Sequence, residues 1–200
     1  LCDRLGIVLP IIQAPIGSAS GPALAAAVSN AGALGMLSVT WRSPEEVRAV
    51  VRATRALTAR PFGVNLVLQW PPDERLAICL EEGVRVVSFF WGDPAPYVAR
   101  VHAAGGLVLH TVAGAEEARR AVAAAADVVV AQGWEAGGHV WSQVSTIALV
   151  PAVVDAVGET PVIAAGGITD GRGLAAILAL GAGAAWMGTR FVASEEAPAH

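Results

Sequence analysis

The feature that most constrains the fold of this chain is a regular alternation of short apolar runs with longer Ala-rich segments. The runs are rich in Val, Ile and Leu, which is typical of strands buried on both faces of a parallel sheet. The eight predicted strands are Pro10–Ala14, Leu34–Val39, Phe62–Leu68, Val84–Phe90, Leu107–Val112, Asp127–Ala131, Pro161–Ala165 and Ala184–Met187.

Helices are predicted between these strands, in Ala-rich sequence dotted with Glu and Arg. The segment Ser43–Glu46 offers an N-cap, a Pro at the first helical position and the Glu of a capping box, and Asp93 and Pro94 repeat the first two elements. The segments with the clearest helical pattern are Pro44–Leu57, Pro94–Ala104, Glu116–Ala125, Thr146–Val157 and Gly171–Leu180.

Eight strand-and-helix repeats predict an α/β fold, a single closed (β/α)8 TIM barrel over residues 1–200. No Gly/Ser linker and no change of composition divides the sequence into two domains. Because the chain ends soon after the eighth run, we expect the barrel to be truncated there and its C-terminal helix to be missing. An open doubly wound sheet is the alternative.

Composition narrows the function classes. The formal net charge is -4 and there is no basic patch, which argues against nucleic acid as a partner, and no apolar run reaches the roughly 18 residues that span a bilayer. We therefore expect a cytoplasmic protein that acts on a small molecule. The sequence does not decide whether the protein forms a homo-oligomer. Cys2 and Cys79 are interpreted as ordinary thiols, and no metal site is expected because metal-ligand spacing is lacking.

Loops seven and eight carry the strongest binding signal. In a (β/α)8 barrel the site lies at the C-terminal ends of the strands, and these two loops are the usual phosphate site. Paired glycines at Gly166 and Gly167 let a phosphate approach backbone N–H groups, helped by a helix N-terminus, and Gly188 and Thr189 follow the next strand. The alternative is that the glycines only make a tight turn.

His139 is the candidate catalytic base. It follows Gly137 and Gly138 on a loop above the barrel mouth, where an imidazole that titrates near neutrality can take a proton from a substrate. The alternative is an ordinary solvated loop histidine. His110, at the end of the fifth predicted strand, is the rival candidate, whereas His102 and His200 are interpreted as surface residues.

Several motifs in order along the chain resemble those of the nitronate monooxygenases, formerly called 2-nitropropane dioxygenases. Together they cover the whole chain, which makes the resemblance more specific than any one glycine motif. The motifs are Ala14-Pro15-Ile16-Gly17, Leu24 to Gly32, Phe62-Gly63-Val64-Asn65-Leu66, Val130 to His139, Pro161 to Gly173, and Met187-Gly188-Thr189-Arg190-Phe191.

The resemblance implies a non-covalent FMN at the barrel mouth and His139 as the catalytic histidine. The implied substrates are oxygen and a nitronate or nitroalkane, with a carbonyl compound and nitrite as products. His139 would help bind the anion and would remove the α-proton of a neutral nitroalkane. The residues implied to surround the cofactor are Ala14, Pro15, Ile16, Asn65, Gln132, Gly137, Gly138, Gly166, Gly167, Gly188 and Thr189.

Three departures from the family pattern leave the substrate open. Ile16 stands where the family usually has Met, Val140 and Trp141 replace a common Arg-Gly, and a substrate-covering segment expected beyond the eighth strand is absent. One alternative function is an NAD(P)H-dependent flavin reductase of quinones or enoyl thioesters. Another is a flavin-binding protein without catalytic activity.

Five of the six tryptophans are expected at the loop face that holds the site, where they would form an aromatic wall. Amphipathic indole rings serve either to bind a substrate or to pack loops onto the barrel, and both interpretations stay open here. The five are Trp41, Trp70, Trp91, Trp134 and Trp141.

Overall fold

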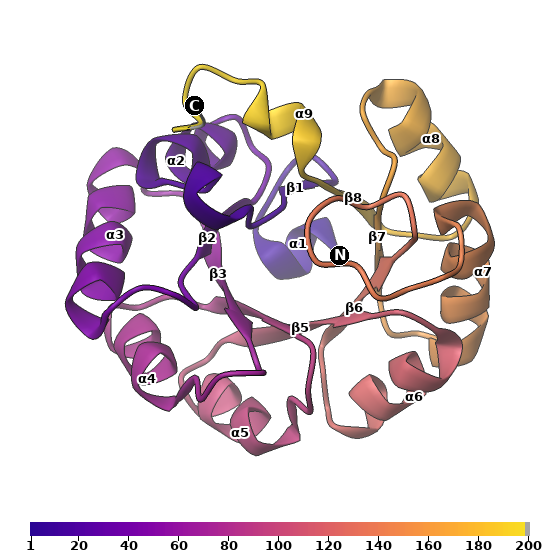
Figure 1. The fold of residues 1–200 in the computed structure, drawn as a ribbon, viewed down its shortest axis with the longest axis horizontal. Coiled ribbons are helices and arrows are strands. Elements are labelled where there is room, and N and C mark those ends of the chain that lie inside the picture. Colours follow the sequence, from indigo (N-terminus) through magenta and orange to yellow (C-terminus); the bar gives the residue numbers. More distant parts are fainter. Residues whose placement is uncertain (199–200) are drawn as a thin grey trace.

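The computed structural model describes residues 1–198; residues 199 and 200, and with them His200, lie outside the described part. Eight parallel strands form one sheet in the order β1-β8-β7-β6-β5-β4-β3-β2, and helices surround it (Figure 1). The strands are β1 (Ile11–Gln13), β2 (Gly35–Ser38), β3 (Phe62–Val67), β4 (Val86–Phe90), β5 (Leu107–Val112), β6 (Val128–Gln132), β7 (Val162–Ala165) and β8 (Ala184–Met187).

The sheet closes on itself between β1 and β2. The two strands meet at a single bridge between Ile12 and Leu34. Beyond that bridge the fully buried side chain of Gln13 takes the place of strand pairing, because its Oε1 accepts the Met36 backbone N–H at 3.0 Å and its Nε2 donates to the Ser20 hydroxyl at 2.9 Å. The predicted closed barrel is therefore confirmed, and the chain does not form the open sheet.

The helices agree with their predicted starts. At α3 the capping box is present: Glu46 N–H donates to the Ser43 hydroxyl, and Ser43 N–H donates to the Glu46 carboxylate at 2.7 Å. At α5 the Asp93 carboxylate accepts the Ala95 N–H at 3.0 Å, so the helix begins just after Pro94. The helices are α1 (Cys2–Leu5), α2 (Pro22–Asn30), α3 (Pro44–Leu57), α4 (Asp73–Glu81), α5 (Ala95–Ala103), α6 (Ala115–Ala123), α7 (Thr146–Val157), α8 (Gly171–Ala179) and α9 (Thr189–Val192), with a 3-10 turn at Gly17–Ala19.

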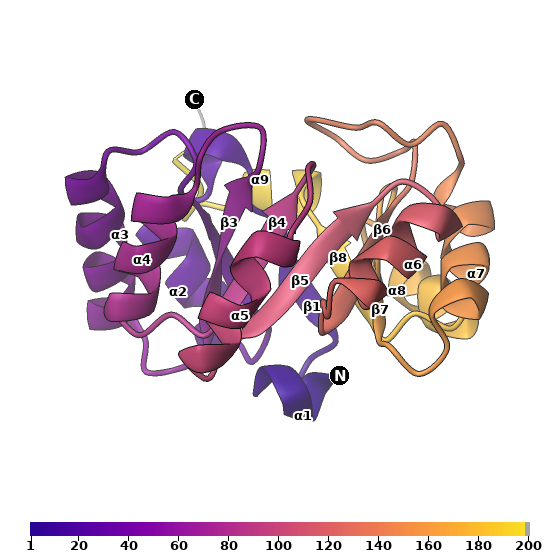
Figure 2. The same cartoon turned by 90° about the horizontal axis from the view of Figure 1, so that it is seen from below.

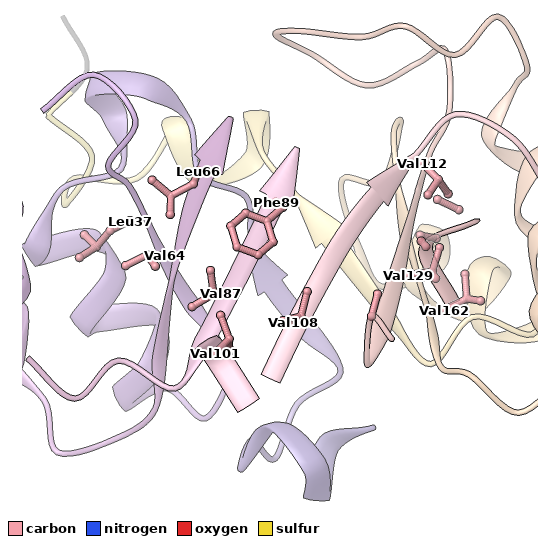
Figure 3. Packing of buried hydrophobic residues seen from close by; sticks show 14 of the residues in the cluster. Leu37, Val64, Leu66, Val87, Phe89, Val101, Val108, Val112, Val129 and Val162 are labelled. Atoms are coloured by element: carbon pink, nitrogen blue, oxygen red, sulfur yellow. The ribbon is translucent and has the colours of Figure 1, made fainter. Parts of the chain in front are cut away.

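Buried apolar side chains form two concentric layers. The larger layer lies between the strands and the outer helices, where residues such as Val64, Val87 and Phe89 meet helix residues such as Val101 (Figure 3). Each fully buried aliphatic side chain contributes about 1.5–3 kcal/mol relative to the exposed state. At Gly35 a Cβ would lie 2.0 Å from the Ala25 carbonyl oxygen, so only glycine lets α2 pack this closely on β2.

The smaller layer fills the barrel, and α1 closes its lower end. Leu5 and Ile7 pack against inward-facing strand residues such as Val128, and α1 lies at the end opposite to the strand arrowheads (Figure 2). In residues 1–198, α1 therefore covers the end of the barrel opposite the carboxyl ends of the strands. Within residues 1–198, no helix is both long and apolar enough to cross a membrane.

Candidate functional site

Polar side chains replace apolar ones on the inner face near the carboxyl ends of the strands. Neighbouring residues of parallel strands point to the same side, and Ser38, Asn65 and Ser88 stand in register on β2, β3 and β4. Asn65 is only 7% exposed, and the hydroxyl of Ser88 has no hydrogen-bond partner among residues 1–198. These groups form the polar floor of the mouth, as expected for Asn65.

Gln132 and His139 come together at this mouth. The Gln132 Nε2 donates to the His139 carbonyl oxygen at 3.2 Å, which ties the loop between β6 and α7 to the end of β6. This loop rises above the strand arrowheads (the orange segment at the top of Figure 2). The Gln132 Oε1 is buried without a hydrogen-bond partner in the described chain, so it is an acceptor that a ligand N–H can satisfy.

Glycines of two loops lie beside Ala14, Ile16 and Thr189. A Cβ on Gly188 would lie 3.6 Å from Ala14 Cβ and from Ile16 Cδ1, and a Cβ on Gly137 would lie 3.7 Å from Thr189 Oγ1. The loops that follow β1, β6 and β8 therefore meet at one rim. Bare backbone at this rim leaves room for a ligand to approach N–H groups closely.

Gly166 and Gly167 extend this rim at the end of β7. Both have positive φ, +116° and +69°, which L side chains rarely adopt. A Cβ on Gly166 would also lie 2.6 Å from Thr146 Oγ1 and 3.0 Å from the Ala136 backbone N. The structure therefore shows a tight turn that requires glycine at both positions, and their part in phosphate binding stays a prediction.

Glu135 and Thr146 hold the loops of β6 and β7 together, a role that the sequence pattern did not reveal. The Glu135 carboxylate accepts the Thr146 backbone N–H at 2.8 Å and its hydroxyl at 2.9 Å. The same hydroxyl lies 3.1 Å from the Gly166 carbonyl oxygen and 3.3 Å from that of Ala165. Partial burial acts to raise the pKa of Glu135, but these hydrogen bonds outweigh it and lower the pKa overall. We call this pair the Glu135–Thr146 brace.

The N-terminus of α8, which is expected to add favourable partial positive charge at the phosphate site, is capped by its own N-cap residue. The Asp170 carboxylate accepts the N–H groups of Arg172 and Gly173 at 2.9 and 3.3 Å. Asp170 is itself negative, so it already neutralises the partial positive charge of this helix end. The N–H groups of Arg172 and Gly173 are therefore already hydrogen-bonded within the protein.

The ring of His139 lies between two indole rings. Trp41 stacks on it with centroids 6.0 Å apart, and Trp91 meets it edge-on at 5.2 Å. Trp70 packs edge-on against Trp41 at 5.9 Å, and Trp141 lies 6.0 Å from Trp91. We call the four tryptophans the aromatic wall; the imidazole that they position remains exposed.

Trp134 does not belong to the aromatic wall, contrary to expectation. It is 63% exposed, and no ring pair joins it to the other tryptophans in the part of the chain that the structure describes. Its neighbour Glu135 accepts hydrogen bonds from the backbone N–H and the hydroxyl of Thr146. The sixth tryptophan, Trp186, stands in register with inward-facing Ile12 and packs in the barrel interior.

His110 and His102 lie in environments that differ from that of His139. His110 is 6% exposed and shares the outward face of β5 with the helix-packed residues Val108 and Val112. Burial lowers its pKa to about 4, although the charge of Asp93 acts in the opposite direction. His102 lies in the last turn of α5, 2.8 Å from the Asp127 carboxylate. His139 is therefore the histidine that the structure places at the mouth.

No three His, Cys, Asp or Glu side chains within residues 1–198 cluster closely enough to hold a metal ion. Cys2 and Cys79 are both free. Burial raises the pKa of the Cys79 thiol to about 12, so this group is inert as a nucleophile at neutral pH.

The fold and the mouth together define a (β/α)8 barrel with a glycine-lined site on loops six to eight. Within that class the chain belongs to the nitronate monooxygenase family, whose model matches residues 1–73 and 69–200. A flavin cofactor is implied by this family. The residues at the mouth fit such a group, because Gln132 Oε1 is an unsatisfied buried acceptor and the Gly137 cradle would be filled by a side chain.

Two relatives and one solved structure show the breadth of this family. A protein of Rhodococcus jostii, named (3aS,4S,5R,7aS)-5-hydroxy-7a-methyl-1-oxo-octahydro-1H-indene-4-carboxyl-CoA dehydrogenase, is 40% identical over 98% of this chain and 55% of its own length. A nitronate monooxygenase of Pseudomonas aeruginosa is 41% identical over 98% and 69%. FabK from Thermotoga maritima is 45% identical, with a TM-score of 0.95 over 99% of this chain and 63% of its own. The chain thus spans only part of the length of these relatives, little more than half for the first.

The alignments with the two relatives differ in length. The alignment with the Rhodococcus protein spans 197 positions, but that with the Pseudomonas enzyme spans 244 against the 200 residues of this chain. The Pseudomonas enzyme therefore has at least 44 residues without a counterpart here. The two segments of the family match meet at residues 69–73, where β3 connects to α4, and this indicates where the additional residues lie.

Proposed function

We propose that the protein is an FMN-dependent oxidoreductase that oxidises a nitronate or its parent nitroalkane with oxygen, giving a carbonyl compound and nitrite. One observation carries the proposal: His139 is exposed at the barrel mouth and held between Trp41 and Trp91, beside the unsatisfied Gln132. Membership of the nitronate monooxygenase family supports it.

Each loop has a defined part in holding FMN in this proposal. Gly166, Gly167, Gly188 and Thr189 offer backbone N–H groups and bare backbone to the single phosphate. The residues after β1 and those of the polar floor would hold the isoalloxazine ring. When bound, the flavin accepts electrons from the substrate and passes them to oxygen. The residues that contact the ring are Ala14, Pro15, Ile16, Asn65, Gln132, Gly137 and Gly138.

His139 acts on the substrate as a base. A neutral nitroalkane has to lose its α-proton before it is oxidised, and an imidazole is suited to take a proton near neutral pH. The stacking of Trp41 fixes the plane of the ring, and the Gln132 hydrogen bond fixes its backbone. A preformed nitronate has already lost this proton, so His139 only helps to bind the anion.

The test compares these two substrates in His139→Asn. General base catalysis is worth about 10²–10⁴-fold, so turnover of a neutral nitroalkane should fall by about that factor. Oxidation of the preformed nitronate should fall much less, because asparagine still donates a hydrogen bond. Both rates are measured by oxygen uptake on the same flavin-replete preparation.

His102→Asn is the matched control, since His102 is a surface histidine paired with Asp127 and outside the mouth. It should leave both rates unchanged. Equal losses for the two substrates in His139→Asn would rule out the base role and leave only an electrostatic or structural one. Loss of both activities in His102→Asn would show that the assay reports folding and not catalysis.

A second candidate function is oxidoreduction of an acyl thioester, and the β3–α4 connection favours it. The Rhodococcus relative, named as a CoA thioester dehydrogenase, aligns without the additional residues that the Pseudomonas enzyme carries. The alignment therefore suggests that the β3–α4 connection has a similar length in this chain and in the dehydrogenase. A short loop leaves the side of the mouth next to Trp70 open to a longer substrate.

Anaerobic absorbance spectra separate the candidates. Bleaching of the bound flavin by a nitronate, with slow or no bleaching by NADH, is expected for nitronate oxidation. Rapid bleaching by NADH without nitronate supports the reductase of quinones or thioesters instead. Retained flavin that no donor reduces, with no effect of His139→Asn, would indicate a non-catalytic flavin-binding protein and overturn both candidates.

A further inference from the structure

The aromatic wall keeps much of its surface uncovered. Trp41, Trp70 and Trp141 are 53%, 43% and 39% exposed, although each lies against another aromatic ring. Large apolar side chains are usually buried when their only role is to pack loops onto a barrel. A contiguous group of exposed indoles at one site is instead typical of a surface that a ligand covers.

Four different loops build this surface, and one of them is strained to do so. Trp41 follows β2, Trp70 follows β3, Trp91 follows β4 and Trp141 lies in the connection after β6. Trp91 has a φ of +57°, a conformation that costs a non-glycine residue about 1–3 kcal/mol and that concentrates at functional sites. In this conformation the indole and the His139 ring lie edge-on, with their centroids 5.2 Å apart.

The uncovered side of the wall coincides with the shortened loop. Only residues 68–72 connect β3 to α4, and Trp70 is in that connection. The Pseudomonas relative carries at least 44 additional residues, which the family match indicates at this point of the chain. In this chain only residues 68–72 follow β3 before α4, and Trp41 and Trp70 are 53% and 43% exposed on the same side of the mouth as His139.

From this arrangement we propose that the aromatic wall is a substrate subsite that selects a flat cyclic group, aromatic or fused-ring, attached to the carbon that is oxidised. Offset or edge-on contact with several indole rings favours such a group by more than its apolar area alone. A short alkyl chain next to the same carbon would leave Trp70 and Trp141 without contact. The proposal rests on the proposed nitronate oxidation for the identity of the reacting group.

The test compares phenylmethyl nitronate with ethyl nitronate on the flavin-replete protein. We expect kcat/KM to be higher for the aryl substrate by roughly ten-fold or more, a preference that corresponds to one or two good ring contacts. Trp70→Leu should reduce this preference to about two-fold or less, mainly through KM. Trp70 packs on Trp41, which in turn stacks on His139, so kcat/KM for the aryl substrate should fall more than kcat/KM for ethyl nitronate.

Trp134→Leu is the matched control, because Trp134 is an exposed tryptophan of the same loop face outside the wall. It should keep the wild-type preference. Trp70→Phe keeps a ring and should restore most of the preference lost in Trp70→Leu, and circular dichroism confirms that each variant is folded. An equal preference for the two nitronates in the wild type, or an equal loss in Trp134→Leu, would overturn the proposal.

Binding of 2-naphthoate, followed by calorimetry, separates this proposal from the proposed function. If neither nitronate is oxidised, but 2-naphthoate binds and Trp70→Leu weakens it at least ten-fold, the subsite stands and the proposed reaction fails. If ethyl nitronate is oxidised and 2-naphthoate binds wild type and Trp70→Leu equally, the reaction stands and the subsite is refuted. Failure of the protein both to turn over nitronates and to bind 2-naphthoate would refute both.

Discussion

Replacement of Thr146 by valine tests the Glu135–Thr146 brace. Valine has nearly the same shape, so the change removes the hydroxyl and leaves the packing of the buried side chain in place. The hydroxyl that is lost has one proton, which faces three acceptors: the Glu135 carboxylate at 2.9 Å and the carbonyl oxygens of Gly166 and Ala165 at 3.1 and 3.3 Å. A hydrogen bond to a charged group contributes about 1.5–3 kcal/mol.

We therefore expect Thr146→Val to lower the free energy of unfolding by about 2 kcal/mol. For a chain of this size this loss lowers Tm by roughly 4–8 °C. Flavin affinity should fall as well, because the hydroxyl holds the carbonyl of Gly166 in the proposed phosphate loop. Thermal unfolding of the flavin-free protein measures the first effect, and fluorescence titration with FMN measures the second.

Thr54→Val is the matched control for this prediction. Thr54 is also a buried threonine, but its hydroxyl donates to the Val50 carbonyl within α3 at 2.8 Å, far from the mouth. The control should lose only about 0.5–1.5 kcal/mol and no FMN affinity. If both variants bind FMN as the wild type does, the brace does not position the phosphate loop and the reasoning is refuted.

The brace also predicts a dependence on pH. Hydrogen bonds lower the pKa of Glu135 in the folded chain, so the fold favours the ionised carboxylate. Such a group contributes stability that is present above its unfolded pKa, about 4.5, and is lost as the pH falls through the folded value. The difference in stability between wild type and Thr146→Val should therefore shrink below about pH 4.5.

Two further predictions concern the rim and the barrel wall. Gly137→Ala should weaken FMN binding about ten-fold, because a methyl group would enter the space next to Thr189. Gly114→Ala is the control and should bind FMN as the wild type does, because no atom lies within 4 Å of the added methyl group. Equal FMN affinities of the two variants in a titration would contradict this prediction. His110→Leu should remove a pH dependence: the folded pKa of about 4 lies below the unfolded 6.5, so wild-type stability should fall by roughly 3 kcal/mol as the pH drops from 6.5 to 4. Urea unfolding at pH 7 and pH 4 checks this, and an identical pH dependence in both proteins would refute it.

The sequence by itself determined the barrel and most of the rim. The sequence alternates strands of Val, Ile and Leu with capped helices, such as the helix whose N-cap is Ser43. Few folds are compatible with this pattern, because parallel strands need helices on their outer face. Paired glycines in a sequence indicate a position where the backbone needs a positive φ or a close approach of other atoms. Gly166 and Gly167 were therefore recognisable before their positive φ angles were known.

The tertiary structure decided which side chains act together. That Gln132 bonds to the His139 carbonyl, that Glu135 reaches Thr146 and that His110 faces outward depend on contacts between residues that the sequence pattern does not pair. Strand alternation alone fixes the face of His110, but the strand register has to be known first, since a shift of one residue reverses every side chain. The same holds for two loop residues: Trp134 lies outside the aromatic wall, and Asp170 caps α8. The direction of a loop side chain depends on the hydrogen bonds around it and not only on its position along the chain.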